Sequence, residues 1–200
     1  MAKLAIINGS PRAAKSNSKA YAAIFKKYYK QDIAEFNINK NNHLEICSRI
    51  EDYENILFVF PLYADGIPVT LLNFLKKLEE YQMNHNIKIH CIVNCGFIEY
   101  QQNTVAIKMI KLFCKKKGFK MGSYLSIGSG EAILKTPFAF LVKFKIKQLA
   151  KAIENERDKA FFVKMPLSKK LFIKASTQYW IGLAKANGVT KEEMETMQIE

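Results

Sequence analysis

The sequence is poor in residues that break or cross-link a chain. It holds 5 prolines, 9 glycines and 4 cysteines in 200 residues, and 49% of its residues are hydrophobic. This composition argues against a disordered chain and predicts a folded domain with a substantial core. Cys47, Cys91, Cys95 and Cys114 lack the spacing of a disulfide framework or a zinc site. We therefore expect free thiols in a reducing cytoplasm, and no metal.

Long apolar segments and the common phosphate-binding fingerprints are absent as well. No run of about 18 apolar residues occurs, so no transmembrane helix is expected. Because the first predicted strand begins at Leu4, we expect no signal peptide. The first glycine-containing loop is neither a G-x-G-x-x-G turn nor a Walker loop, which argues against Rossmann-type dinucleotide binding and against ATP hydrolysis.

Acidic residues are scarce relative to basic ones. The chain has 31 Lys and Arg against 18 Asp and Glu, a net charge of +13, and most of the excess lies between Lys108 and Lys174. Such a segment suits an anionic partner: a phosphorylated cofactor, a membrane surface or nucleic acid. It also suits a solvated lysine-rich surface, which is preferred because lysines do not make the forked contacts that read bases. No nucleic acid is expected.

The sequence does contain a regular alternation of strand and helix patterns. Strands are predicted at Leu4–Ile7, Asp32–Phe36, Ile56–Phe60, Ile87–Asn94 and Phe119–Ile127. Helices are predicted at Asn17–Lys30, Pro68–Gln82, Thr104–Lys117, Phe138–Lys159 and Leu167–Asn187, with a capping-box helix start at Thr190–Glu193. His43–Tyr53 is either a short helix or an irregular crossover. This order predicts a parallel sheet with helices on both faces. We expect one domain over residues 1–200, with a ligand-binding core at 1–130 and a helical elaboration at 131–200.

The first of three unusual strand-end loops spans Gly9–Ser18. Ligands of an open parallel sheet bind beyond the carboxyl ends of its strands. This loop offers backbone N–H groups, hydroxyls and a guanidinium close to a helix N-terminus, where an anion is favoured. The candidate phosphate ligands are Ser10, Arg12, Ser16, Asn17 and Ser18. The alternative is a polar strand–helix turn with an ordinary N-cap.

The second loop, Pro61–Pro68, places Leu62 and Tyr63 at a strand end between two prolines. Apolar and aromatic surfaces of this kind suit stacking on a flat heteroaromatic ring. The alternative is that Tyr63 packs on the rim of the core.

The third loop, Asn94–Tyr100, leaves its strand through Gly96. Its aromatic residues, Phe97 and Tyr100, are candidates to flank a ring edge. Its backbone amides are candidates to stabilise negative charge that develops on the ring. The alternative is that both aromatics belong to the core. Cys95 is not favoured as a nucleophile because no partner base is identifiable.

Together these loops resemble the flavodoxin-like NAD(P)H-dependent FMN reductases and NAD(P)H:quinone oxidoreductases. The resemblance covers roughly residues 1–130. The shared residues are Asn8-Gly9-Ser10-Pro11-Arg12 with Ser16-Asn17-Ser18, then Pro61-Leu62-Tyr63 through Pro68, and Phe74-Leu75. It implies a flavodoxin-like three-layer α/β sandwich whose five-stranded parallel sheet has the order 2-1-3-4-5, with extra C-terminal helices.

The resemblance also implies non-covalent FMN, with its phosphate held by the first loop. The ring and ribityl chain would be lined by Pro61, Leu62, Tyr63, Ala64 and Asp65. The other ring edge would be closed by Cys95, Gly96, Phe97 and Tyr100. Hydride would pass from NAD(P)H through flavin N5 to flavin, quinone or another small acceptor, with no catalytic side chain required. Tyr63 and Tyr100 are candidate proton donors to a quinone.

The chain departs from the family in places. Asn73 stands where many relatives have a lysine, and the third loop lacks their Gly-Gly pair. The relatives imply a homodimer or tetramer, and the basic segment suggests NADPH as the preferred donor.

Two other functions stay open. A non-catalytic flavodoxin-type electron carrier is disfavoured by the charge of +13 and by Arg12. A peripheral membrane contact through 138–159 rests on the mixture of apolar residues and lysines at Leu141–Lys147. Packing of that helix on the domain, or at a dimer seam, is preferred.

Overall fold

The computed structural model describes residues 4–12, 15–83 and 87–196, and the chain divides into two compact units. The first unit is Met1–Met165 and the second is Pro166–Glu200. Among the helices of the described residues, none is both long and apolar enough to cross a membrane.

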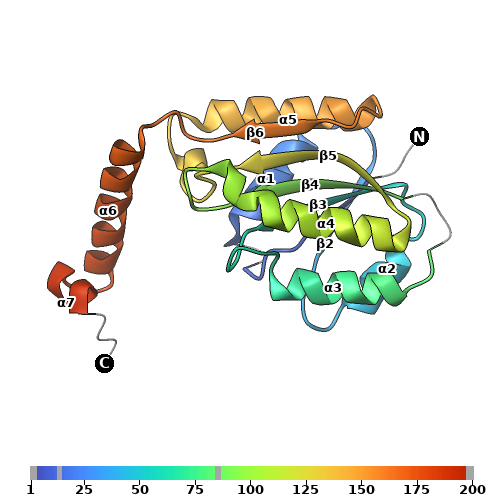
Figure 1. Cartoon of the computed structure of the whole chain (residues 1–200), viewed down its shortest axis with the longest axis horizontal. Helices are drawn as coiled ribbons and strands as arrows, with labels where there is room; N and C mark the ends of the chain where they lie inside the picture. Colours follow the sequence, from blue (N-terminus) through green and yellow to red (C-terminus); the bar gives the residue numbers. More distant parts are fainter. Residues whose placement is uncertain (1–3, 13–14, 84–86, 197–200) are drawn as a thin grey trace. The chain divides into compact units, whose positions relative to one another are not determined.

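The first unit is built on a parallel six-stranded sheet of order β2-β1-β3-β4-β5-β6 (Figure 1). The predicted order of the first five strands is confirmed. The strands are β1 (Leu4–Asn8), β2 (Ile33–Asn37), β3 (Asn55–Pro61), β4 (Lys88–Asn94), β5 (Lys120–Ile127) and β6 (Ala160–Val163).

The sixth strand, β6, was not predicted. It pairs with β5 in parallel, from Tyr124 opposite Ala160 to Ile127 opposite Val163. With 4 residues it is too short to show a hydrophobic period, although two phenylalanines and a valine are typical of strands. Its position at the sheet edge depends on pairing with β5 rather than on its own pattern.

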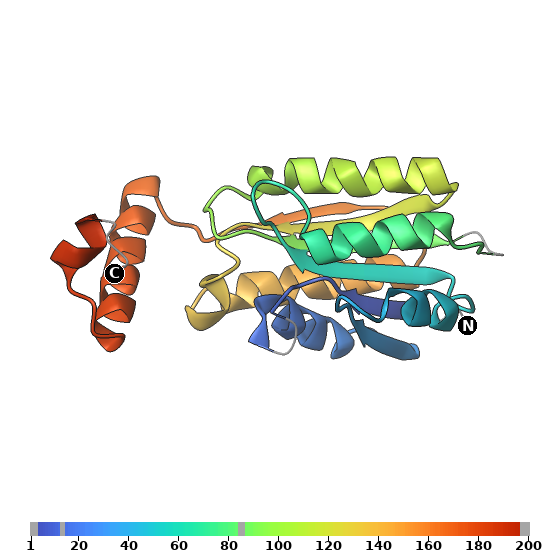
Figure 2. The ribbon, with the colours of Figure 1, turned by 90° about the horizontal axis from the view of Figure 1, so that it is seen from below.

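Helices cover both faces of this sheet, which gives the predicted three layers. The helices of the first unit are α1 (Asn17–Lys26), α2 (His43–Arg49), α3 (Val69–Glu80), α4 (Thr104–Lys117) and α5 (Ala139–Glu154), with short 3₁₀ turns at Tyr100–Asn103 and Ile133–Lys135. Figure 2 shows α1 and α5 on one side of the sheet and α3 and α4 on the other. The middle strands are therefore covered twice, and Ile56–Phe60 of β3 is fully buried.

Helix α5 packs its apolar side on the sheet, as preferred from the sequence. Val142, Ile146 and Leu149 are buried, and the helix contacts β5 and β6. It ends at Glu154 rather than at the predicted Lys159 because the chain turns there into β6.

The second unit consists of α6 (Lys169–Ala186) and α7 (Lys191–Thr196). The predicted capping box starts α7. The Thr190 N–H donates to Glu193 Oε2 at 2.7 Å, and the Glu193 N–H donates to Thr190 Oγ1 at 3.2 Å.

One buried polar side chain, His90 of β4, makes the core sensitive to acid. Its Nδ1 accepts a hydrogen bond from the Ser123 N–H at 3.0 Å, so Nε2 carries the proton and donates to Asn55 Oδ1 at 3.1 Å. Burial, with a smaller contribution from the Lys88 charge, lowers the pKa of His90 to about 4, while the Asp158 carboxylate acts in the opposite direction.

We predict that the free energy of unfolding falls between pH 6.5 and pH 4 partly through His90. In this window the unfolded chain binds the proton and the folded chain does not, so His90 contributes a loss of up to about 3 kcal/mol as the pH falls. Urea unfolding across this range measures the slope. His90→Gln keeps every carboxylate and should show a shallower pH dependence; equal slopes for the two proteins would contradict the assignment.

Candidate functional site

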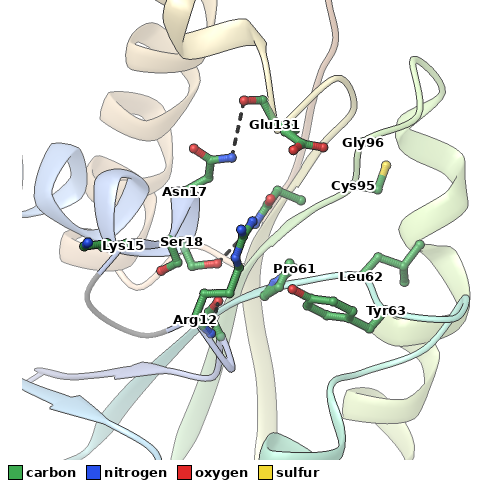
Figure 3. A pocket seen from close by; sticks show the side chains of 13 residues that line it. Arg12, Lys15, Asn17, Ser18, Pro61, Leu62, Tyr63, Cys95, Gly96 and Glu131 are labelled. Carbon is green, nitrogen blue, oxygen red and sulfur yellow. Dashed lines mark hydrogen bonds between the residues drawn. The ribbon is translucent and has the colours of Figure 1, made fainter. Parts of the chain in front are cut away.

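A pocket of about 200 Å³ opens at the carboxyl ends of β1, β3 and β4 (Figure 3). The strand order switches here, because β1 is followed by β2 on one side and β3 by β4 on the other. Loops that diverge at such a point leave a crevice between them. The pocket is lined by Ser10, Arg12, Lys15, Ser16, Asn17, Ser18, Pro61, Leu62, Tyr63, Asn94, Cys95, Gly96 and Glu131.

The turn after β1 is fixed by side chains that bond back to its own backbone. Asn8 Oδ1 accepts from the Ser10 N–H at 3.1 Å, while Asn8 Nδ2 donates to Asn37 Oδ1 of β2 at 2.9 Å. The Ser10 Oγ in turn accepts from the Arg12 N–H at 3.4 Å. These bonds hold the loop beside the pocket before any ligand enters it.

The N-terminus of α1 faces the same pocket. Ser16 is the N-cap, and its Oγ accepts from the Lys19 N–H at 3.1 Å, whereas no acidic residue lies in the first turn. Arg12 and Lys15 line the pocket from the same loop, and Figure 3 shows the Arg12 side chain pointing into it. A helix N-terminus with two cationic side chains favours an anion here.

The second loop forms a tight two-residue turn. The Tyr63 N–H donates to the Gly66 carbonyl at 3.1 Å, and the Gly66 N–H donates to the Tyr63 carbonyl at 2.9 Å. Ala64 and Asp65 at its tip have φ of 43° and 57°, a left-handed conformation that Asp tolerates better than Ala. The turn places Tyr63 on the pocket wall, where it is 44% exposed, so its ring does not pack in the core.

Asn94, at the end of β4, ties three of the loops together. Its side chain is buried, and Nδ2 donates to the Phe60 carbonyl at 3.1 Å and to Ser18 Oγ at 3.3 Å. Its own carbonyl accepts from the Leu62 N–H at 2.7 Å. Asn94 therefore sets the distance between the cationic loop and the Pro61–Tyr63 segment.

A fourth loop, after β5, closes the pocket from the side of α1. The Gly130 N–H donates to the Cys95 carbonyl at 2.7 Å, and the Gly130 carbonyl accepts from the Tyr21 hydroxyl at 2.5 Å. The Asn17 side chain donates to the Glu131 carbonyl at 3.3 Å. The backbones approach so closely here that a Cβ on Gly128 would lie 2.3 Å from the Ile98 carbonyl oxygen.

The thiol of Cys95 is buried at the base of this arrangement. Burial raises its pKa to about 11, against the smaller opposing effect of a hydrogen bond with the backbone of Phe97. A thiol that stays protonated at neutral pH is a poor nucleophile, which agrees with the low rank it had from the sequence.

The structure brings most of the predicted site residues together. The predicted residues that line the pocket are Ser10, Arg12, Ser16, Asn17, Ser18, Pro61, Leu62, Tyr63, Cys95 and Gly96. Four others lie outside its wall. Ala64 and Asp65 are at the turn tip, Phe97 is 54% exposed, and Tyr100 packs on Phe162 of β6 with ring centroids 4.9 Å apart.

Lys15, Asn94 and Glu131 line the pocket but were not predicted. Lys15 and Asn94 each lie beside a predicted residue and had a local signal in the first and third loops. Glu131 had no such signal, because it lies far from the other pocket residues in the sequence. The fold brings its loop beside α1, where the Glu131 carbonyl accepts from the Asn17 side chain.

No protein-family model and no curated protein sequence matches the chain. Solved structures do resemble it. The Trp repressor binding protein from Bacillus subtilis matches with a TM-score of 0.61 and 15% identity, over 73% of this chain and 99% of that one. A Fusobacterium nucleatum flavodoxin bound to flavin mononucleotide matches with a TM-score of 0.60 and 18% identity, over 79% and 100%. The NAD(P)H:quinone oxidoreductase from Methanothermobacter marburgensis matches with a TM-score of 0.59 and 13% identity, over 76% and 97%. The fold is therefore flavodoxin-like, with one strand more than predicted.

We predict that Asn94→Ala loosens the three loops that it joins. The variant leaves the buried Phe60 carbonyl without its amide donor, so the free energy of unfolding should fall by about 1–3 kcal/mol. Hydrogen exchange should also rise at residues 9–18 and 60–66.

Asn103→Ala is the matched control. Asn103 is equally buried and its Nδ2 donates to the carbonyls of Val93 and Ile127, but it does not line the pocket. It should lose similar stability with exchange unchanged at 9–18. Identical exchange patterns in the two variants would contradict the role of Asn94.

Proposed function

We propose that the protein binds FMN in this pocket and passes reducing equivalents from NAD(P)H to a small acceptor such as a flavin or a quinone. One observation carries the proposal: the pocket has two chemically different walls. One is the hydroxyl-rich, cationic turn at the N-terminus of α1, and the other is the apolar and aromatic segment Pro61–Tyr63. A ligand with a phosphate at one end and a flat ring at the other fits such a pair of walls.

The first wall suits the phosphate end. Ser10, Ser16 and Ser18 supply hydroxyls, and Arg12 and Lys15 supply positive charge within the same pocket. Charge-assisted bonds from a guanidinium to a phosphate are stronger than neutral ones. These residues would hold the phosphate and fix the position of the rest of the ligand.

The second wall suits the ring end. Leu62 and the half-exposed Tyr63 offer flat apolar surface at the pocket wall, and Cys95 and Gly96 lie on the wall formed by the third loop. Bound FMN would supply the hydride and electron chemistry there. The chain's part is to orient the ring, to keep water from one face and to leave the other face accessible. Of the two tyrosines considered as proton donors to a quinone, only Tyr63 lines the pocket.

Similar structures support a flavin as the ligand, since they include a flavodoxin bound to flavin mononucleotide and an NAD(P)H:quinone oxidoreductase. They also keep a second candidate open, a flavodoxin-type electron carrier that does not itself oxidise NAD(P)H. The net charge of +13 favours the reductase, because a basic surface attracts the phosphates of NADPH.

We predict that the purified protein, with FMN added, oxidises NADPH continuously when a quinone or free flavin is supplied. NADPH should give a higher kcat/KM than NADH because its extra phosphate meets the basic surface. Steady-state loss of NADPH absorbance measures both rates. Binding of FMN without any NADPH or NADH oxidation would reject the reductase and leave the electron carrier.

We predict that Arg12→Ala weakens FMN binding roughly tenfold and riboflavin binding much less, because it removes a charged contact to the phosphate. Flavin fluorescence titrations with the two ligands measure the difference. Lys19→Ala is the matched control, since it also removes one positive charge from an exposed position near the turn but does not line the pocket. An equal loss for both flavins in Arg12→Ala would contradict the assigned role.

A further inference from the structure

Helix α6 of the second unit has two sides of different chemistry. At 3.6 residues per turn, Phe172, Ile173, Tyr179, Trp180 and Leu183 fall on one side of the helix. The rings of Tyr179 and Trp180 meet edge to face with centroids 5.3 Å apart. This side is therefore a continuous apolar stripe with two aromatic side chains that also carry a polar atom.

The opposite side of α6 carries three of its four lysines, together with Leu171 and Ile181. Lys170, Lys174 and Lys185 follow one another at helical spacing on that side, and Lys169 begins the helix. No Asp or Glu occurs between Lys159 and Thr190. The carboxylates of the second unit come only afterwards, from α7 onward.

The apolar stripe of α6 is exposed. The helix has 18 residues and none is buried; Ile173 is 53% exposed, Trp180 44% and Leu183 43%. By contrast α5, which carries a similar mixture of apolar residues and lysines, buries Val142, Ile146 and Leu149 against the sheet. An exposed stripe of large apolar side chains marks an interaction surface.

Both ends of the helix are capped without the use of that surface. Ser168 caps its N-terminus by accepting from the Leu171 N–H at 3.3 Å, and Gly188 with φ of 75° follows the C-cap residue Asn187. Within the second unit, α7 supplies the neighbouring element. The stripe on α6 is thus available to something larger than the unit itself.

We propose that α6 lies in the headgroup region of a lipid bilayer that carries anionic lipids, with its apolar stripe inserted and its lysines in contact with the headgroups. Charge decides between this surface and a second copy of the chain. A second copy of α6 would cover the stripe but would offer these lysines no acidic group, whereas anionic headgroups complement the lysines as well as cover the stripe. Tyr179 and Trp180 are the residue types enriched at the boundary between lipid and water.

The length of α6 fits a helix that lies on a bilayer. At about 1.5 Å per residue its 18 residues extend about 27 Å, and its lysines exclude it as a spanning helix. The protein would therefore bind reversibly, and high salt would release it.

Trp180 makes the test direct because it is the only tryptophan in the chain. The full-length protein is mixed with vesicles of phosphatidylcholine alone or with added phosphatidylglycerol. We expect it to sediment with the anionic vesicles only, with a blue shift of Trp180 emission and release at high salt.

Two variants separate the contributions of the two sides. Lys170→Gln with Lys174→Gln should lower partitioning to anionic vesicles roughly thirtyfold, since each lysine near the surface contributes about fivefold. The matched control is Lys108→Gln with Lys115→Gln on α4. It removes the same charge from exposed positions and should change the partitioning to vesicles far less. Ile173→Ser with Leu183→Ser keeps Trp180 and should abolish the blue shift while circular dichroism still shows the helices.

Failure to sediment with anionic vesicles would overturn the proposal. Equal losses in the α4 control and in Lys170→Gln with Lys174→Gln would also overturn it, because binding would then follow net charge alone. Lipid-free self-association that Ile173→Ser with Leu183→Ser abolishes would assign the stripe to a second copy instead. None of these outcomes depends on whether the first unit binds a flavin.

Discussion

The site depends on one buried amide, the side chain of Asn94. It donates to the Phe60 carbonyl and to Ser18, and its backbone carbonyl accepts from Leu62. Three loops that leave the sheet in different directions are thereby held at fixed separations. An amide is suited to this position because its two donor hydrogens can serve two loops at once, and burial makes each of these bonds costly to lose.

The parallel sheet explains why such a tie is needed. β1 and β3 are neighbours, but the chain continues from β1 toward one edge of the sheet and from β3 toward the other edge. The loops that follow them therefore separate above the carboxyl ends of the strands. Side chains of opposite character then face one gap, with Arg12 and the serines on one side and Leu62 and Tyr63 on the other. The division into a polar wall and an apolar wall follows from strand order, and the distance between the walls follows from Asn94.

The strands and helices could be predicted from the sequence where a segment has a strong local pattern of its own. Ile56–Phe60 is apolar throughout and lies under helices on both faces, and Gly9–Ser18 combines a turn with a helix start. What the sequence could not show depends on contacts between distant segments. The edge strand β6 needs β5 as its partner. Tyr100 lies outside the pocket and packs against the ring of Phe162 in β6. Glu131 reaches the pocket only because its loop bonds to α1.

The most direct test of the central claim is a titration of the purified protein into FMN, followed by the fluorescence and visible absorption of the flavin. A pocket with a phosphate wall and a ring wall predicts saturable binding at micromolar concentration, with changed flavin fluorescence and a shifted visible spectrum. Flavin fluorescence and absorption that stay unchanged throughout the titration would contradict the claim that this pocket is a flavin site.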